Sequence, residues 1–242
     1  MTSWFIADLH LDASRPRVTQ LLITFLQQVK GQADALYILG DLFEYWVGDD
    51  ALDSVHAAHF LPAITRLREV SDSGVALYFM HGNRDFLVGE RFAESTGCTL
   101  LPEQCLIDLY GTPTLLLHGD TLCTDDVDYQ QVRKLFRNPQ WQQQFLALPL
   151  DERIRQAEAM RMQSRISMQG KAETILDVNQ QAVNTALRCM GVSCMIHGHT
   201  HRPAVHEFVL DGALMQRVVL GDWHEDKGSF LQVGVGQMKL EC

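Results

Sequence analysis

Five short polar clusters hold residue types that bind divalent metal ions, namely carboxylates, imidazoles and a side-chain amide. They are Asp8-Leu9-His10, Gly40-Asp41-Leu42-Phe43-Glu44, Gly82-Asn83-Arg84-Asp85, His118-Gly119-Asp120 and His197-Gly198-His199-Thr200-His201. None contains a cysteine, so the set suits manganese, iron or zinc in catalysis better than a structural zinc site. Seven candidate ligands, enough for two ions, are Asp8, His10, Asp41, Asn83, His118, His197 and His199. The predicted chemistry is hydrolysis by a metal-activated water molecule.

One such cluster alone would be weak evidence for a metal site, because Gly-Asp is usually a turn. Five clusters in this order are specific evidence for one. Glycines precede or separate the polar residues, as tight turns and a close backbone approach beside cations require. Glu44 and Asp85 either orient metal ligands or are ordinary loop carboxylates. His201 is ambiguous as well, because it neighbours two candidate ligands.

Each cluster follows a short apolar run that is typical of a buried strand. The runs cover residues 4–7, 35–39, 75–80, 114–117 and 193–196. Helical spacing of apolar residues marks 17–30 and 57–73 as helices, each with a glycine just beyond its end. Alternating strands and helices predict an α/β layered fold, in which ligand loops gather at the carboxyl ends of strands. After Val205, strand-like segments separated by turns predict a mixed or antiparallel edge.

The chain has 242 residues and a net charge of −10, which predicts a single domain over 1–242. Residues 128–171 differ from the rest, with eight Lys or Arg and four acidic residues, a local net charge of +4. Aromatic residues and two prolines in this segment indicate short helices, so we interpret it as an inserted helical cap. The acidic remainder argues against a nucleic-acid-binding protein, since such proteins neutralise phosphates with Lys and Arg.

No basic leader and no run of about 18 apolar residues is present, which predicts a protein that is intracellular and at most peripherally bound to a membrane. The six cysteines form no Cys-x-x-Cys pair, so we expect reduced thiols.

The ordered clusters resemble those of the calcineurin-like metallophosphoesterases. The resemblance implies a four-layer α/β/β/α sandwich and two metal ions, with manganese as the expected metal. It also implies that Asp41 bridges the ions, with Asp8, His10 and His199 completing one site and Asn83, His118 and His197 the other. A hydroxide activated by both metals would then attack phosphorus.

Arg84 is informative, because the wider superfamily commonly has a histidine after the asparagine, within reach of the leaving group. Arginine cannot donate a proton near neutral pH. A phosphate monoester leaves readily as an anion, whereas an alkoxide needs protonation, so Arg84 favours cleavage of a diphosphate.

The motifs as a whole resemble the UDP-2,3-diacylglucosamine pyrophosphatase family, from the first strand to the last. That family hydrolyses UDP-2,3-diacylglucosamine at the α-phosphorus to UMP and 2,3-diacylglucosamine 1-phosphate (lipid X), in lipid A biosynthesis at the cytoplasmic face of the inner membrane. Asp41, Arg84 and His197 are the expected catalytic residues. The substrate contacts implied are Asn83, Arg84, Asp126, Arg161, Ser164, Met168, Lys171 and His197, although Met168 departs from the polar asparagine of the closest family members.

Apolar cap residues such as Trp141 and Phe145 either form the core of a small subdomain or, given a lipid substrate, line an acyl pocket. The basic cap also suits peripheral contact with anionic inner-membrane lipids, without a lipid anchor. The sequence indicates no obligate protein partner. Three rival functions remain: a phosphoesterase for soluble substrates, a scaffold without turnover, and a nuclease. The apolar cap argues against soluble substrates, and the complete ligand set argues against a scaffold. The acidic core argues against a nuclease.

Overall fold

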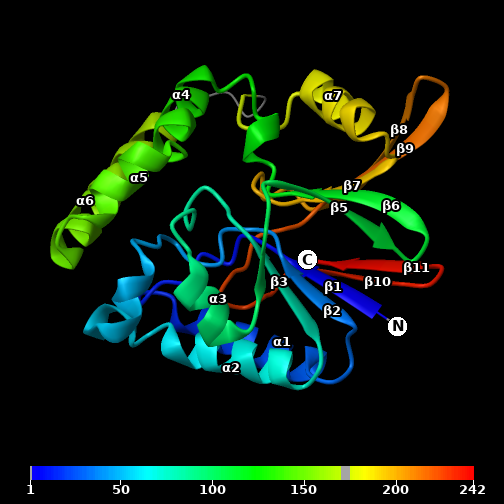
Figure 1. Cartoon of the computed structure of the whole chain (residues 1–242). Coiled ribbons are helices and arrows are strands. Elements are labelled where there is room, and N and C mark those ends of the chain that lie inside the picture. Colours follow the sequence, from blue (N-terminus) through cyan, green and yellow to red (C-terminus); the bar gives the residue numbers. More distant parts are fainter. Residues whose placement is uncertain (1, 170–174) are drawn as a thin grey trace.

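Two β-sheets face one another at the centre of the computed structural model, which describes residues 2–169 and 175–242, apart from the Met168 side chain (Figure 1). The first sheet has the order β11-β10-β1-β2-β3-β4 and the second the order β5-β6-β7-β9-β8. The first comprises β1 (Thr2–Ile6), β2 (Ala35–Ile38), β3 (Ala76–Met80), β4 (Thr99–Leu101), β10 (Phe230–Gly234) and β11 (Gln237–Glu241). The second comprises β5 (Gln104–Leu109), β6 (Thr112–Leu117), β7 (Cys194–His197), β8 (Ala204–Leu210) and β9 (Ala213–Val219).

Helices cover the outer faces of both sheets (Figure 1). The first sheet is covered by α1 (Pro16–Val29), α2 (Leu61–Asp72) and α3 (Glu90–Thr96), and the second by α7 (Gln180–Met190). Short 3-10 turns lie at η1 (Asp49–Asp53), η2 (Val55–Ala57) and η3 (Asp120–Leu122). Three separate apolar clusters fill the three interfaces between these layers. The predicted α/β fold is therefore confirmed, and its layers follow the order α/β/β/α.

Successive residues of the central strands enter different cores, because side chains alternate across a strand. On β1, Trp4 packs against the helices while Phe5 packs between the sheets. On β7, Met195 faces α7 and Ile196 faces the first sheet. Burial on both faces explains why these strands are continuous apolar runs in the sequence. The segments after residue 203 pair antiparallel as predicted, with β8 against β9 and β10 against β1 and β11.

Three helices lie apart from the sandwich layers, over the edge where the strands of the first sheet end (Figure 1). They are α4 (Val127–Phe136), α5 (Pro139–Leu146) and α6 (Leu150–Met168), and we call them the cap helices. Asn138 caps α5, because its side chain accepts hydrogen bonds from the backbone N–H groups of Gln140 and Trp141. Pro139 occupies the first turn, where its missing N–H costs nothing. The two prolines that the sequence marks as breakers thus separate three helices.

Candidate active site

Loops that follow five strands meet at one edge of the two sheets. Backbone hydrogen bonds join neighbouring loops: Asp8 N donates to Gly40 O at 3.1 Å, and His10 N donates to Asp41 O at 3.0 Å. Across the sheets, His199 N donates to Asp8 Oδ2 at 2.7 Å. These bonds bring side chains nearly two hundred residues apart in sequence into one cluster.

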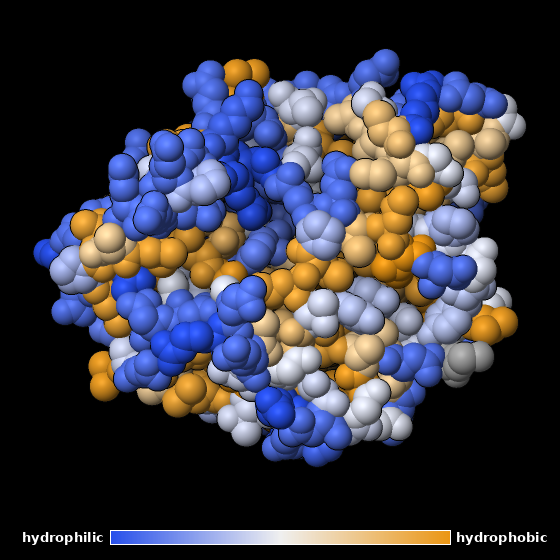
Figure 2. Space-filling view, viewed as in Figure 1, coloured by the Kyte–Doolittle hydropathy of each residue, from blue (hydrophilic) through white to orange (hydrophobic). Residues whose placement is uncertain are grey.

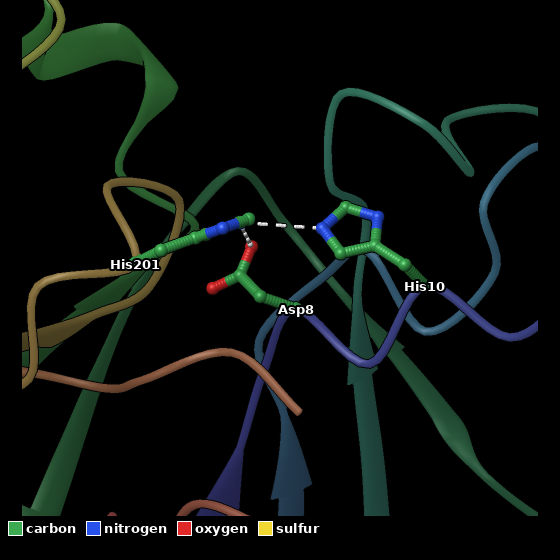
Figure 3. Close-up of side chains that lie close together, drawn as sticks. All are labelled: Asp8, His10 and His201. Carbon is green, nitrogen blue, oxygen red and sulfur yellow. Dashed lines mark hydrogen bonds and ion pairs between the residues drawn. The ribbon is translucent and has the colours of Figure 1, made fainter. Parts of the chain in front are cut away.

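One half of the cluster contains Asp8, His10 and His201 (Figure 3). His201 Nε2 lies 3.5 Å from Asp8 Oδ1 and 3.3 Å from His10 Nε2. His10 Nε2 also lies 3.9 Å from Asp41 Oδ2. Figure 3 shows the two imidazole rings pointing toward each other, with their planes tilted, beside the Asp8 carboxylate.

The other half contains Asn83, His118 and His199, with Asp41 between the halves. His118 Nε2 lies 3.8 Å from Asp41 Oδ2, the same oxygen that lies near His10. Asn83 Oδ1 lies 3.0 Å from His118 Nε2 and 2.9 Å from His199 Nδ1. One carboxylate oxygen thus faces both groups of nitrogen and oxygen donors.

The donor set fits divalent cations. Asp8 is completely buried, and its Oδ1 has no hydrogen-bond donor among the described residues. In the described ranges the ion-pair partners of Asp8 and Asp41 are histidines, namely His10, His118 and His201, and neither carboxylate pairs with a lysine or arginine. Mixed carboxylate, amide and imidazole donors match the preferences of catalytic transition metals.

The backbone of the cluster is held in an uncommon conformation. Five of its residues other than glycine have positive φ angles between 50° and 69°, namely Asp8, His10, Asp41, His199 and His201. Such left-handed residues cost roughly 1–2 kcal/mol each, and they persist where the surrounding structure imposes them, often at functional sites. A Cβ on Gly82 would collide with Asp41, and one on Gly198 with the Asp8 carboxylate. The predicted need for close backbone approach is met at both glycines.

His197 does not join this cluster, which corrects its prediction as a metal ligand. It is the last residue of β7, two after Met195, so its side chain points toward the α7 side of the sheet. Its Nδ1 lies 2.9 Å from Gly198 O and its Nε2 lies 3.1 Å from Arg217 Nη1. Burial lowers the pKa of His197 to about 3, and the nearby Arg217 contributes. The neutral ring donates to Gly198 O and accepts from Arg217, while His201 takes the expected place in the cluster.

Asp85 links the two loops of the site that follow β2 and β3. Its buried carboxylate accepts hydrogen bonds from Gly82 N and Leu42 N, both at 2.8 Å, and from Asp41 N at 3.3 Å. Of the two roles left open by the sequence, the structure supports positioning of the ligand loops.

Replacing Asp85 by alanine is expected to lower the free energy of unfolding by about 2–4 kcal/mol, because several buried N–H groups lose their acceptor. Asp85→Asn keeps one acceptor oxygen and should lie between that variant and the original protein. Thermal unfolding of the metal-free proteins, followed by circular dichroism, measures this. Equal melting temperatures for all three would contradict the role of Asp85.

Glu44 connects the cluster to the cap helices. Its Oε2 lies 3.1 Å from His10 Nδ1, and its Oε1 pairs with Arg161 Nε on α6. The cap residue Arg161 therefore contacts Glu44, which in turn contacts the candidate metal ligand His10.

A cavity of about 670 Å³ separates the cluster from the cap helices. Its floor includes Asp41 and Asn83, and its cap side includes Phe136, Trp141 and Phe145. Figure 2 shows hydrophobic residues along the line where the cap meets the body, beneath a hydrophilic outer surface. The predicted substrate residues Arg84, Asp126, Arg161 and Ser164 all line this cavity. Lys171 and the Met168 side chain lie outside the described part of the chain.

Tyr129 is a cavity residue that the sequence does not single out. Its hydroxyl donates to Asp120 Oδ2 at 2.8 Å, and its ring lies 5.9 Å from that of His199. Burial and the Asp120 carboxylate raise the pKa of Tyr129, so the phenol stays protonated. Only the path of α4 brings it there, so no local pattern could have indicated it.

The model of the calcineurin-like phosphoesterase family matches residues 1–203, and the chain belongs to that family. Among curated proteins it is similar to several that are named UDP-2,3-diacylglucosamine hydrolase. The protein from Nitrosococcus oceani is 52% identical over 95% of this chain and 90% of the relative. That from Serratia proteamaculans is 51% identical over 99% and 98%, and that from Stenotrophomonas maltophilia 49% identical over 100% and 98%.

The family is one of metal-dependent hydrolases, and candidate ligand groups for a divalent metal are present among the described residues. None of the described helices is both long enough and apolar enough to cross a membrane.

Proposed function

We propose that this enzyme hydrolyses the diphosphate of UDP-2,3-diacylglucosamine at the α-phosphorus and releases UMP and 2,3-diacylglucosamine 1-phosphate, a step of lipid A biosynthesis. The observation that supports it most directly is the cavity, in which a polar ligand cluster faces an apolar cap. A substrate with a diphosphate and two acyl chains has the same two-part chemistry. The near full-length similarity to proteins named for this substrate supports the same reaction.

We propose two manganese ions as the cofactor. One would be held by Asp8, His10, Asp41 and His201, and the other by Asp41, Asn83, His118 and His199. When bound, such ions neutralise phosphate oxygens and make a water molecule nucleophilic at neutral pH. Asp41 would contribute to both positions, since its Oδ2 faces both groups of donors.

Arg84 would bind the leaving phosphate. Its backbone N–H donates to Asp41 Oδ1 at 2.8 Å, which fixes the residue beside the cluster. Its side chain lines the cavity and forms no ion pair within residues 2–169 or 175–242, so the guanidinium can bind an anion. Because arginine stays protonated, it stabilises a phosphate leaving group as an anion and donates no proton to it.

The cap helices would hold the lipid half of the substrate. Asp126, Arg161 and Ser164 would contact the sugar, while Phe136, Trp141 and Phe145 would contact acyl chains. Exposed Met162 and Ile166 lie on α6 with Arg165, a composition that favours contact with an anionic membrane surface. Peripheral association with the cytoplasmic face of the inner membrane would place the site near its substrate.

Arg84→Ala is expected to lower kcat/KM for the lipid substrate roughly 10- to 100-fold, the equivalent of one charge-assisted hydrogen bond or two. Arg84→Lys keeps the charge but not the planar fork, so it should lie in between. Kinetics measured beside metal content by mass spectrometry separate this effect from ligand loss. Unchanged kcat/KM in Arg84→Ala would show that Arg84 does not bind the leaving phosphate.

The deciding experiment is UMP release from UDP-2,3-diacylglucosamine by metal-stripped protein to which manganese is returned, with UDP-glucose and an aryl phosphate alongside. The expected result is manganese-dependent release from the lipid substrate alone. Equal turnover of all three would favour a phosphoesterase for soluble substrates. No turnover with metals bound would favour the scaffold.

A further inference from the structure

Arg217 on β9 is a buried cation without a buried counter-charge. Only 7% of the residue is exposed, and no carboxylate in the described ranges lies within 4.0 Å of its guanidinium nitrogens. Its one hydrogen bond among these residues joins Nη1 to His197 Nε2 at 3.1 Å. Because an unpaired buried charge costs several kcal/mol, Arg217 is a candidate for binding a ligand that supplies the missing acceptors.

Arg217 lines a second cavity of about 230 Å³. The strand register pairs His206 with Arg217, so both side chains stand on the same face of the sheet. Asp177 and Arg202 line it too, with Arg202 Nη1 bound to Asp177 Oδ2 at 2.9 Å.

The two cavities adjoin at Thr200 and Arg202, which line both. Thr200 lies between the candidate ligands His199 and His201, and its buried hydroxyl has no partner among the described residues. A substrate whose diphosphate lies at the cluster would extend one half toward the cap and the other half into this second cavity. Its volume is below the ~300–1,000 Å³ of sites for drug-sized ligands, so it suits a single ring.

The polar groups that line the cavity include both the donors and the acceptor that the edge of one pyrimidine requires. Uracil presents a carbonyl oxygen, an N–H and a second carbonyl oxygen along its Watson–Crick edge, and proteins read unstacked bases on that edge. The guanidinium groups of Arg217 and Arg202 offer only donors, and the Asp177 carboxylate offers only acceptors. Cytosine would place the lone pair of N3 where uracil has its N–H, against the carboxylate.

We propose that this second cavity, lined by Asp177, Thr200, Arg202, His206 and Arg217, binds the base of the nucleoside half of the substrate and selects uracil over cytosine. The inference rests on the proposed function for the identity of the nucleotide. The lipid half and the nucleoside half are then read by separate cavities that share one metal cluster.

The test is calorimetric titration of the manganese-loaded protein with UMP and, separately, with CMP. UMP is expected to bind about tenfold more tightly, the value of one well-formed hydrogen bond. Asp177→Asn, at a partly exposed position, offers an amide that can donate to N3 and should bring the ratio close to one. Arg217→Met should weaken UMP about tenfold or more while the affinity for 2,3-diacylglucosamine 1-phosphate stays within twofold. Arg188→Met, which removes an exposed arginine on α7, is the matched control and should behave as the original protein.

Equal affinity for UMP and CMP in the original protein would overturn the inference, as would an unchanged UMP to CMP ratio in Asp177→Asn. Should Arg217→Met fail to fold, judged by its circular dichroism spectrum, the Asp177→Asn ratio decides alone. A preference for UMP in a protein that releases no UMP from the lipid substrate would support the nucleoside site and overturn the proposed function. The two ideas can therefore fail separately.

Discussion

Asp41→Ala is expected to abolish manganese-dependent UMP release, with a loss of at least about 1,000-fold in kcat. The estimate follows because even outer partners of metal ligands are typically worth 10- to 100-fold, and Asp41 faces both candidate positions. Its Oδ2 lies 3.9 Å from His10 Nε2 and 3.8 Å from His118 Nε2, so its removal separates both donor groups from their shared oxygen. Activity and bound manganese should fall together.

The control for this variant is Asp72→Ala, which removes an exposed aspartate that pairs with Arg68 on the helix surface. It should keep the metal content and the turnover of the original protein. Circular dichroism spectra establish that both variants are folded. Full activity in Asp41→Ala, or two retained metal ions per chain, would overturn the proposed site.

His201→Ala and His197→Ala form the second comparison. The sequence predicts His197 as a metal ligand, whereas in the structure His201 lies in the cluster and His197 does not. His201→Ala should lose about half of the bound manganese and at least about 100-fold in kcat, since its ring lies 3.5 Å from Asp8 and 3.3 Å from His10. His197→Ala should keep both ions, because both ring nitrogens have protein partners outside the cluster.

Metal content is the readout that separates the two histidines, since activity alone would not. His197→Ala removes the partner of Arg217, so we expect a loss of stability of about 1–3 kcal/mol without metal loss. Full manganese occupancy in His201→Ala, or half occupancy in His197→Ala, would restore the original assignment of His197 as a ligand.

The sequence predicted most of the cluster because metal chemistry restricts residue types strongly and each group follows a strand. Asp8, Asp41, Asn83 and His118 lie at strand ends that share one edge, and their order in the chain was sufficient to bring them together. It also predicted the layers, since both faces of the central strands are buried and their apolar runs are continuous.

The choice between His197 and His201 could not be made in the same way. Side chains two apart point to the same face of an extended chain, so the pattern His197-Gly198-His199-Thr200-His201 offers two equivalent pairs. The strand ends at His197, and the positive φ angles of His199 and His201 turn the chain away from strand geometry. Met195 and Ile196 are apolar and buried on opposite faces of the sheet, so the sequence does not show which face is the inner one. The direction of the His197 side chain therefore cannot be predicted from it.

Contacts between distant helices were also beyond sequence reasoning. Tyr129 contacts Asp120 and the ring of His199, and no pattern in the sequence of α4 indicates either contact. The ion pair of Arg161 with Glu44 joins residues 117 positions apart, and neither neighbourhood contains a sign of the other. Such contacts depend on how loops close, which local patterns do not determine.

The cap helices lie within a single connection between adjacent parallel strands. β6 ends at Leu117, β7 begins at Cys194, and the two pair directly in the second sheet. This crossover needs only one helix to return the chain, and α7 supplies it. Residues 123–179 are therefore an exchangeable module: a relative could shorten, lengthen or replace them and acquire a different substrate range while its hydrolytic machinery stayed intact. A chimaera that keeps β6, α7 and β7 but carries another crossover would show how far chemistry and substrate choice can diverge within one fold.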